Sequence, residues 1–165
     1  MFQKLALNTF DKSPFALIGE EWTLITAGTE EKCNTMTASW GSLGVLWGSP
    51  MATVYIRPQR FTKEFVDREE YFSLSFFSED YRQKLAFCGK ESGKEVDKIE
   101  KCGFTMAFDQ APYMQEAHFV LICKKRCCQP LDSSLIPREI KEKWYPEEDY
   151  HWVYYGEIVE ALRKV

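Results

Sequence analysis

Residues 71–77 read Tyr71-Phe72-Ser73-Leu74-Ser75-Phe76-Phe77, an alternation of large apolar and small polar side chains. Successive side chains of a β-strand point to opposite faces of its sheet. A period of two therefore predicts a half-buried strand, with Phe72, Leu74 and Phe76 facing the core and the serines facing away from it.

Predicted strands outnumber predicted helices along the rest of the chain. Runs rich in β-branched and aromatic residues predict strands at 15–18, 22–27, 34–39, 51–56, 104–108, 117–127 and 152–159. Four helices are expected, at 62–70, 80–87, 93–101 and 137–144, with Thr62 as the N-cap of the first and Gly103 closing the third. Residues 41–48 form a glycine-rich stretch between two strands. This pattern predicts one mainly β domain over residues 1–165, an antiparallel β-barrel with peripheral helices.

Composition narrows the classes of function. Of the 165 residues, 45% are apolar and 15% are aromatic, enough for one sizeable core at this length. The formal net charge of −4 is opposite to the basic surplus that nucleic-acid-binding proteins usually carry. The longest purely apolar run, 119–123, is too short to cross a membrane, and the first residues lack the apolar stretch of a signal peptide. We therefore expect a cytoplasmic protein that binds neither nucleic acid nor membrane.

Several site types have no support in the sequence. No G-x-G-x-x-G follows a predicted strand, and no C-x-x-C or H-E-x-x-H is present, so we expect no Rossmann dinucleotide site and no metal site. Cys123, Cys127 and Cys128 form a cluster that a soft metal could use, but reduced thiols are the favoured interpretation. The sequence gives these cysteines and His151 no defined role.

Two segments carry groups suited to a ligand with one flat end and one anionic end. In Asn34-Thr35-Met36-Thr37-Ala38-Ser39-Trp40, a strand end offers hydroxyl and amide donors beside an indole. In Arg57-Pro58-Gln59-Arg60-Phe61-Thr62, two arginines stand at the start of a predicted helix, a combination typical of phosphate sites. The alternatives are an ordinary capped strand end for the first segment and a surface Arg60–Glu64 pair for the second. Lys90, Ser92 and Gly93 offer further donors or belong to a solvated loop.

These segments resemble the flavin reductase-like family, especially its flavoredoxin-like branch. The agreement runs through residues 34–47, Pro50, and residues 57–65, 71–77, 89–98 and 151–158, in that order. It therefore spans nearly the whole chain, and its motifs are more specific for the fold and for flavin binding than for one activity.

The resemblance implies an FMN-binding split β-barrel, normally a homodimer with the flavin near the subunit interface. It implies a flavin-ring and ribityl site at Asn34, Met36, Thr37, Ala38, Ser39 and Trp40, and a phosphate site at Arg57, Arg60, Phe61 and Thr62. Arg57 ends a strand, whose alternation can also aim it elsewhere. Further cofactor contacts are implied at Phe76 and Phe77, at Lys90, Ser92 and Gly93, and, toward the flavin of the partner subunit, at Trp152 and Tyr155.

The implied activity is an NAD(P)H-dependent flavin reductase that transfers hydride from nicotinamide to FMN. That chemistry belongs to the cofactor, so no catalytic acid, base or nucleophile is assigned. The alternative is a flavoredoxin-like electron carrier with tightly bound FMN and a protein redox partner. A barrel that has lost its flavin, or an oxidase of the pyridoxamine-phosphate type, fits the motifs less well. The preferred nucleotide, the electron acceptor and the status of flavin as substrate or prosthetic group stay open.

Overall fold

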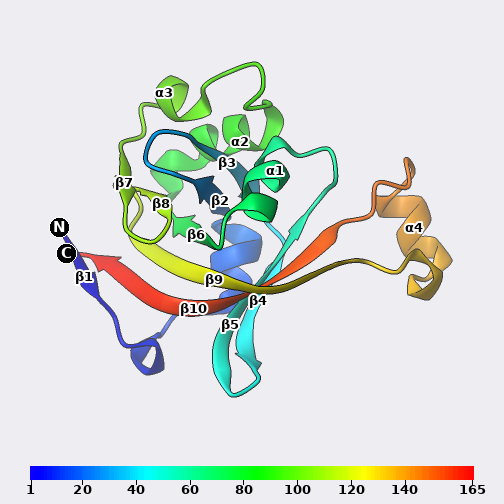
Figure 1. Cartoon of the computed structure of the whole chain (residues 1–165), viewed down its shortest axis with the longest axis horizontal. Coiled ribbons are helices and arrows are strands. Elements are labelled where there is room, and N and C mark those ends of the chain that lie inside the picture. The colour runs from blue at the N-terminus through cyan, green and yellow to red at the C-terminus, as the bar shows by residue number, and fades with distance from the viewer.

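The computed structural model describes residues 1–165, and one antiparallel sheet dominates it (Figure 1). Seven strands follow one another in the order β3, β2, β6, β9, β10, β5, β4, and β1 joins the sheet on β10. Their bounds are β1 (Phe2–Lys4), β2 (Thr23–Gly28), β3 (Cys33–Ala38), β4 (Gly41–Leu46), β5 (Ser49–Ile56), β6 (Tyr71–Phe76), β9 (Phe119–Pro130) and β10 (Trp152–Lys164). A separate pair consists of β7 (Met106–Phe108) and β8 (Pro112–Met114).

The sheet curls round on itself. Its two outermost strands, β3 and β4, are joined by only Ser39 and Trp40, so the two ends of the sheet must meet at that point. Hydrogen-bonded pairing does not continue from β3 to β4. The expected mainly β barrel with peripheral helices is therefore confirmed, as a barrel that is open along one line.

Three of the four helices cover one side of this barrel, next to β2 and β3 (Figure 1). The helices are α1 (Phe61–Arg68), α2 (Arg82–Lys90), α3 (Lys98–Cys102) and α4 (Arg138–Trp144). Helix α1 buries Phe65 and Val66 in the core, which its spacing of apolar residues allows. None of the helices is long and apolar enough to serve as a membrane span.

Strand β6 is buried on both faces, so the prediction of a half-buried strand is wrong for its serine face. Phe72, Leu74 and Phe76 lie in the core enclosed by the barrel, as expected. Ser73 and Ser75 are equally inaccessible, because the segment around β8 covers them. The hydroxyl of Ser73 donates to the carbonyl of Pro112 (2.5 Å), and the hydroxyl of Ser75 accepts from the backbone N–H of Met114 (3.4 Å). Small hydroxyl residues thus permit close backbone approach without an unpaired polar group.

Other local predictions also need correction. Residues 16–20 form a π-helical turn rather than part of a strand, and the glycine-rich 41–48 stretch contains strand β4. A Cβ on Gly41 would lie 2.9 Å from the Thr53 carbonyl oxygen of β5, so glycine there permits strand pairing. The helix predicted at 93–101 is confined to α3, although Gly103 closes it as expected, with φ 60°. Thr62 lies inside α1, whose N-cap position is occupied by Arg60.

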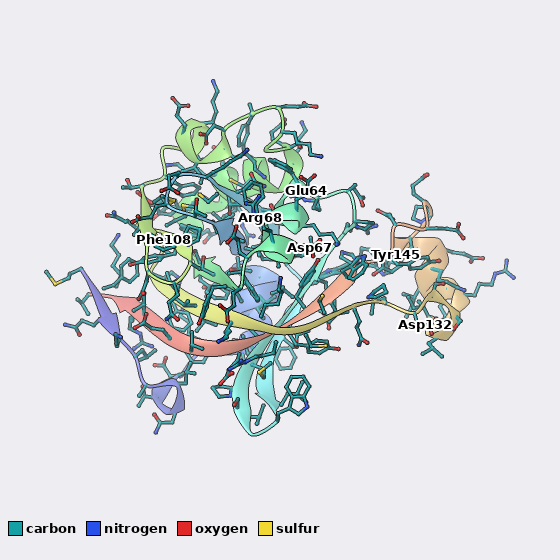
Figure 2. All side chains as sticks on the ribbon, viewed as in Figure 1. Glu64, Asp67, Arg68, Phe108, Asp132 and Tyr145 are labelled. Carbon is teal, nitrogen blue, oxygen red and sulfur yellow. The ribbon has the colours of Figure 1, made fainter.

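Strands β9 and β10 form a long antiparallel ribbon whose far end carries residues 131–151, here called the arm. The arm contains α4, which stands apart from the other helices in Figure 1. The backbone N–H of Leu131 donates to the carbonyl of His151 (2.9 Å) and closes the base of the arm. Figure 2 shows Tyr145 where the arm meets the strands and Asp132 farther along it.

Candidate functional site

A cavity of about 230 Å³ lies between the barrel and the arm. Its lining combines the end of β3, the β3–β4 connection, β5 and its following loop, and the arm: Met36, Thr37, Ala38, Ser39, Trp40, Tyr55, Arg57, Arg60, Trp144 and His151. Seven of these are residues that the sequence predicted for the site. The structure therefore brings the 34–40 segment together with both arginines.

The β3 floor of the cavity is firmly held. Met36 and Ala38 are buried, and β3 pairs with β2 along its whole length. The Thr37 hydroxyl donates to the carbonyl of Leu85 in α2, which ties the strand to the helix behind it. A fixed, mostly apolar floor is the usual lining of a small-molecule site.

Aromatic rings form the walls of the cavity. The rings of Trp40 and Trp144 meet edge to face at 5.0 Å between centroids, and the imidazole of His151 lies 5.2 Å from Trp40. Tyr55 meets His151 at 6.5 Å. Such walls suit a flat aromatic ligand, because rings contact one another favourably at these separations.

Two cations converge on the carbonyl end of α2: Arg60, which lines this cavity, and Lys98, which lines another one. Arg60 donates from NH1 to the carbonyl of Gly89 (2.6 Å) and from NH2 to that of Cys88 (3.4 Å). Lys98, only 3% exposed, donates to the same Cys88 carbonyl (3.2 Å). Neither cation has a carboxylate within ion-pair distance, although other lysines and arginines of the chain do.

The surroundings of these two cations leave their charge poorly compensated. Burial, and for Lys98 the nearby Arg60 charge, lowers the pKa of Lys98 to about 8, and burial also lowers the pKa of Arg60. The partial negative charge of the α2 C-terminus offsets this only in part. Buried cations without a counter-ion are costly, and an anionic group at this position would relieve that cost.

Asn34, Thr62 and Gly93 form a tightly packed group beside the cations. The Asn34 amide donates to the Thr62 hydroxyl (2.8 Å), which joins β3 to the first turn of α1. A Cβ on Gly93 would lie 2.0 Å from Asn34 Oδ1, so only glycine lets the 91–97 loop approach this closely. Asn34 and Gly93, together with Lys98, line another cavity, of about 460 Å³, rather than the one between barrel and arm.

Arg57 is engaged differently from Arg60. Its NH1 forms an ion pair with Asp149 (2.5 Å), its NH2 donates to the Trp144 carbonyl (2.9 Å), and its guanidinium lies 5.1 Å from the centre of the Tyr145 ring. Burial opposes ionisation of Asp149, but hydrogen bonds from Gln59 (2.7 Å) and Arg57 lower its pKa overall. Arg57 therefore binds the arm.

His151 is a neutral imidazole at the inner edge of the arm. Its Nδ1 lies 2.7 Å from the Tyr145 hydroxyl, and the ring is 7% exposed. Burial, together with the nearby Arg57 charge, lowers the pKa of His151 to about 4. The ring thus presents a polar but uncharged edge to the cavity at neutral pH.

The remaining predicted residues do not line this cavity. Phe76 and Phe77 are buried in the hydrophobic core. The ring of Phe61 packs against that of Phe65 and faces the Lys94 ammonium. The Lys63 ammonium nitrogen lies 4.2 Å from the centre of the Trp152 ring. The hydroxyl of Tyr155 accepts from Gln129 (3.2 Å). Lys90 is exposed at the end of α2, and Ser92 caps the loop by accepting from the N–H of Lys94 (3.2 Å).

Sequence reasoning missed four residues that build the site: Tyr55, Lys98, Trp144 and Tyr145. Lys98 lies in the 89–98 block that carried the family resemblance, which was a signal for it. Tyr55 is the one member of the 51–56 strand whose side chain faces the cavity. Nothing local marks Trp144 and Tyr145, because they reach the site only through the ribbon that carries the arm.

A larger cavity, of about 710 Å³, opens on the other side of Trp40. It shares Ser39, Trp40 and Tyr55 with the first cavity, and none of its lining residues is charged. Elsewhere, Cys123 is buried while Cys127 and Cys128 are exposed on β9. No group of three or more His, Cys, Asp or Glu side chains is placed to hold a metal ion.

Comparison with solved structures finds the same fold in several flavoproteins. A flavoredoxin from Methanosarcina acetivorans is 24% identical, with a TM-score of 0.68 over 87% of this chain and 68% of that chain. The flavoredoxin of Desulfovibrio vulgaris (Miyazaki F) is 18% identical, with a TM-score of 0.67 over 98% and 77%. An NADH:FAD oxidoreductase from Streptomyces globisporus C-1027, determined with NAD and FAD fragments, is 16% identical, with a TM-score of 0.66 over 87% and 74%.

A comparison with curated proteins finds no match. The family model described as "Flavin reductase like domain" matches residues 16–163, which include the cavity, both arginines and the arm. The chain therefore belongs to the flavin reductase-like family.

Proposed function

We propose that this chain binds FMN in the cavity between barrel and arm and acts as an NAD(P)H-dependent flavin reductase. The observation that carries the proposal is a pair of carboxylate-free cations at the end of α2: a half-buried Arg60 that lines the cavity with aromatic walls, and a buried Lys98 that donates to the same Cys88 carbonyl. A flavin mononucleotide would bring an anionic phosphate to these cations and a flat ring to the aromatic walls. Relatives of the same fold are described as flavoredoxins and as an NADH:FAD oxidoreductase, which supports a flavin as the ligand.

Different groups of residues would bind the phosphate and the ring of the flavin mononucleotide. Arg60 and Lys98 would hold the phosphate, with Thr62, Lys90, Ser92 and Gly93 around it, and Asn34 would fix the geometry of that end. Met36, Thr37, Ala38, Ser39 and Trp40 would line the ring, with hydroxyl and backbone donors of Thr37 and Ser39 near its polar edge. When bound, the flavin supplies a hydride acceptor for a reduced nicotinamide, so the protein needs no acid or base of its own.

The proposal includes a homodimer in the cytoplasm. Phe15, Val45 and Trp47 are large apolar side chains more than 60% exposed, and a second copy of the chain would cover such a surface. Trp152 and Tyr155 would then contribute to the flavin site of the partner subunit. Six cysteines without a disulfide are compatible with a reducing compartment.

A second candidate is a flavoredoxin-like electron carrier with resident FMN and a protein redox partner. The arm favours it, since Trp144 and His151 cover part of the cavity and would shield a bound ring from solvent. Anaerobic addition of NADH and NADPH to the FMN-loaded protein separates the two candidates. Bleaching by either nucleotide supports the reductase and names its donor, whereas flavin that stays oxidised supports the carrier.

The binding site itself is tested by titrating the purified protein with FMN and with riboflavin, which lacks the phosphate. In Arg60→Gln, FMN affinity is expected to fall about 10- to 100-fold because one charge-assisted contact is lost. Riboflavin affinity should stay the same. Arg68→Gln, which removes an exposed arginine of α1, is the matched control. Equal FMN affinity in both variants would refute the phosphate site.

A further inference from the structure

The arm is attached to the barrel by a small set of side-chain contacts. The loop after β5 supplies three of them: the Arg57–Asp149 ion pair, the bond from Arg57 to the Trp144 carbonyl, and the Gln59–Asp149 hydrogen bond. Aromatic contacts add to these: Trp40 meets Trp144 and His151, and Tyr55 meets His151. The Arg57 guanidinium also lies over the Tyr145 ring. Arg57 takes part in two of the three polar contacts.

Both terminal nitrogens of the Arg57 guanidinium point to the arm. NH1 is bonded to a carboxylate and NH2 to a backbone carbonyl, while the face of the group lies over Tyr145. A guanidinium held on two edges and one face has a fixed orientation. Arg60, three residues later, donates instead to carbonyls at the end of α2.

The residues that Arg57 holds are those that close the cavity. Trp144 forms one wall, and its neighbour Tyr145 fixes the imidazole of His151 through the 2.7 Å contact between its hydroxyl and Nδ1. Loss of Arg57 would leave the half-buried Asp149 carboxylate with Gln59 as its only donor side chain. Most of the polar contacts that hold the arm against the barrel would then be lost.

We propose that Arg57 is a positioning residue that fixes the arm, and that it sets how closely Trp144 and His151 enclose a ligand in the cavity. The proposal rests on flavin binding in this cavity, but it assigns Arg57 to the wall and not to the phosphate. A change at Arg57 then affects all ligands of the cavity alike, whether or not they carry a phosphate.

The first test measures the arm on the protein without any ligand. Arg138, Lys141 and Lys143 of the arm are trypsin sites. In Arg57→Gln and in Asp149→Asn, we expect tryptic cleavage at these sites to be at least about 5-fold faster, because a released segment is cut through its open form. The effect of the double variant should be smaller than the product of the two single effects, since both substitutions remove the Arg57–Asp149 ion pair. Glu142→Gln, which breaks only a pair within the arm, is the control.

The second test compares FMN with riboflavin. In Arg57→Gln, the affinities for both are expected to fall by the same factor, about 3- to 10-fold, and Trp144→Ala should reproduce this pattern. If FMN affinity falls at least 10-fold more than riboflavin affinity, Arg57 is a phosphate ligand and the proposal is wrong. Unchanged cleavage in both single variants would also overturn it. If the wild-type chain binds no flavin, the proposed function fails, while the cleavage test still decides whether Arg57 holds the arm.

Discussion

The two sides of the cavity are held in place by different forces. The floor belongs to β3, with Met36 and Ala38 buried and backbone pairing to β2 along the whole strand. The wall belongs to the arm and depends on one ion pair, two hydrogen bonds and a few aromatic contacts. A sheet resists displacement because many bonds must break together, whereas a few side-chain contacts can be lost singly. We infer that the floor defines where a ligand lies and that the wall can adjust to it.

The largest expected difference between these regions is in stability. Phe72 is fully buried in the barrel, so Phe72→Ala should lower the free energy of unfolding by about 4 kcal/mol through lost burial and the cavity left behind. Trp144 is 42% exposed, and Trp144→Ala should cost less than about 1 kcal/mol. Urea denaturation measures both. Equal costs would mean that the arm is part of the cooperative core.

The wall should also respond to pH through His151. The unfolded imidazole binds its proton near pH 6.5, but the folded one does so only near pH 4, so the unfolded state holds more protons between these values. Stability is therefore expected to fall by up to about 3 kcal/mol as the pH drops through this window. Denaturation of His151→Gln at pH 7 and pH 4.5 should show a smaller loss. His118 is 32% exposed, so His118→Gln should reduce the loss of stability at low pH less than His151→Gln does. A larger reduction in His118→Gln than in His151→Gln would contradict this account.

The charge of Lys98 should destabilise the folded chain but strengthen the binding of an anionic ligand. The lowered pKa of Lys98 means that its charged form is less favourable in the folded protein than in the unfolded one, although it still predominates at pH 7. Lys98→Met should raise the stability of the ligand-free chain by about 1–2 kcal/mol and weaken FMN binding at least about 10-fold. Thermal unfolding with and without FMN measures both effects. Lys101→Met, an exposed neighbour on α3, should leave both unchanged, and a destabilised Lys98→Met would refute the interpretation.

The smallest effect is expected for an ion pair inside the arm. Arg138 and Glu142 are four residues apart on α4 and largely exposed. Glu142→Gln should therefore lower the free energy of unfolding by only about 0.3 kcal/mol. A loss above about 1 kcal/mol in urea denaturation would show that the internal structure of the arm, and not its anchor on the barrel, limits its stability.

Periodicity predicted the strands whose two faces differ or whose centres are apolar, including β2, β3, β5, β6, β9 and the first half of β10. It missed β4, because the glycines of this segment lower its strand propensity. Glycine at position 41 allows the close approach of β4 to β5, which no local sequence pattern reveals. It also misjudged the serine face of β6, where the covering segment lies 39 residues further along the chain.

The candidate site, like the fold, was predictable only where the signal is local in the sequence. Segments 34–40 and 57–62 were identifiable because each carries its chemistry in consecutive residues. The contribution of the arm could not be predicted, because Arg57 and the Trp144 carbonyl that it binds are 87 residues apart in the sequence. The sequence around an arginine at a strand end does not indicate which group the arginine will bind. Phe76 and Phe77 were implied as cofactor contacts by the family motif; the structure buries Phe76 in one core cluster and Phe77 in the other.

The line along which the barrel is open has a consequence for recognition. Strands β3 and β4 each have a neighbour on one side only, so the outward row of backbone N–H and C=O groups of each is free of the sheet's own bonding. The Ser39–Trp40 corner of the cavity sits where these two rows begin. A fully closed barrel would have bonded those groups to each other. At the Ser39–Trp40 corner, therefore, the sheet itself does not use up the main-chain donors and acceptors that face the cavity, and a ligand can bond to them whichever side chains lie beside them.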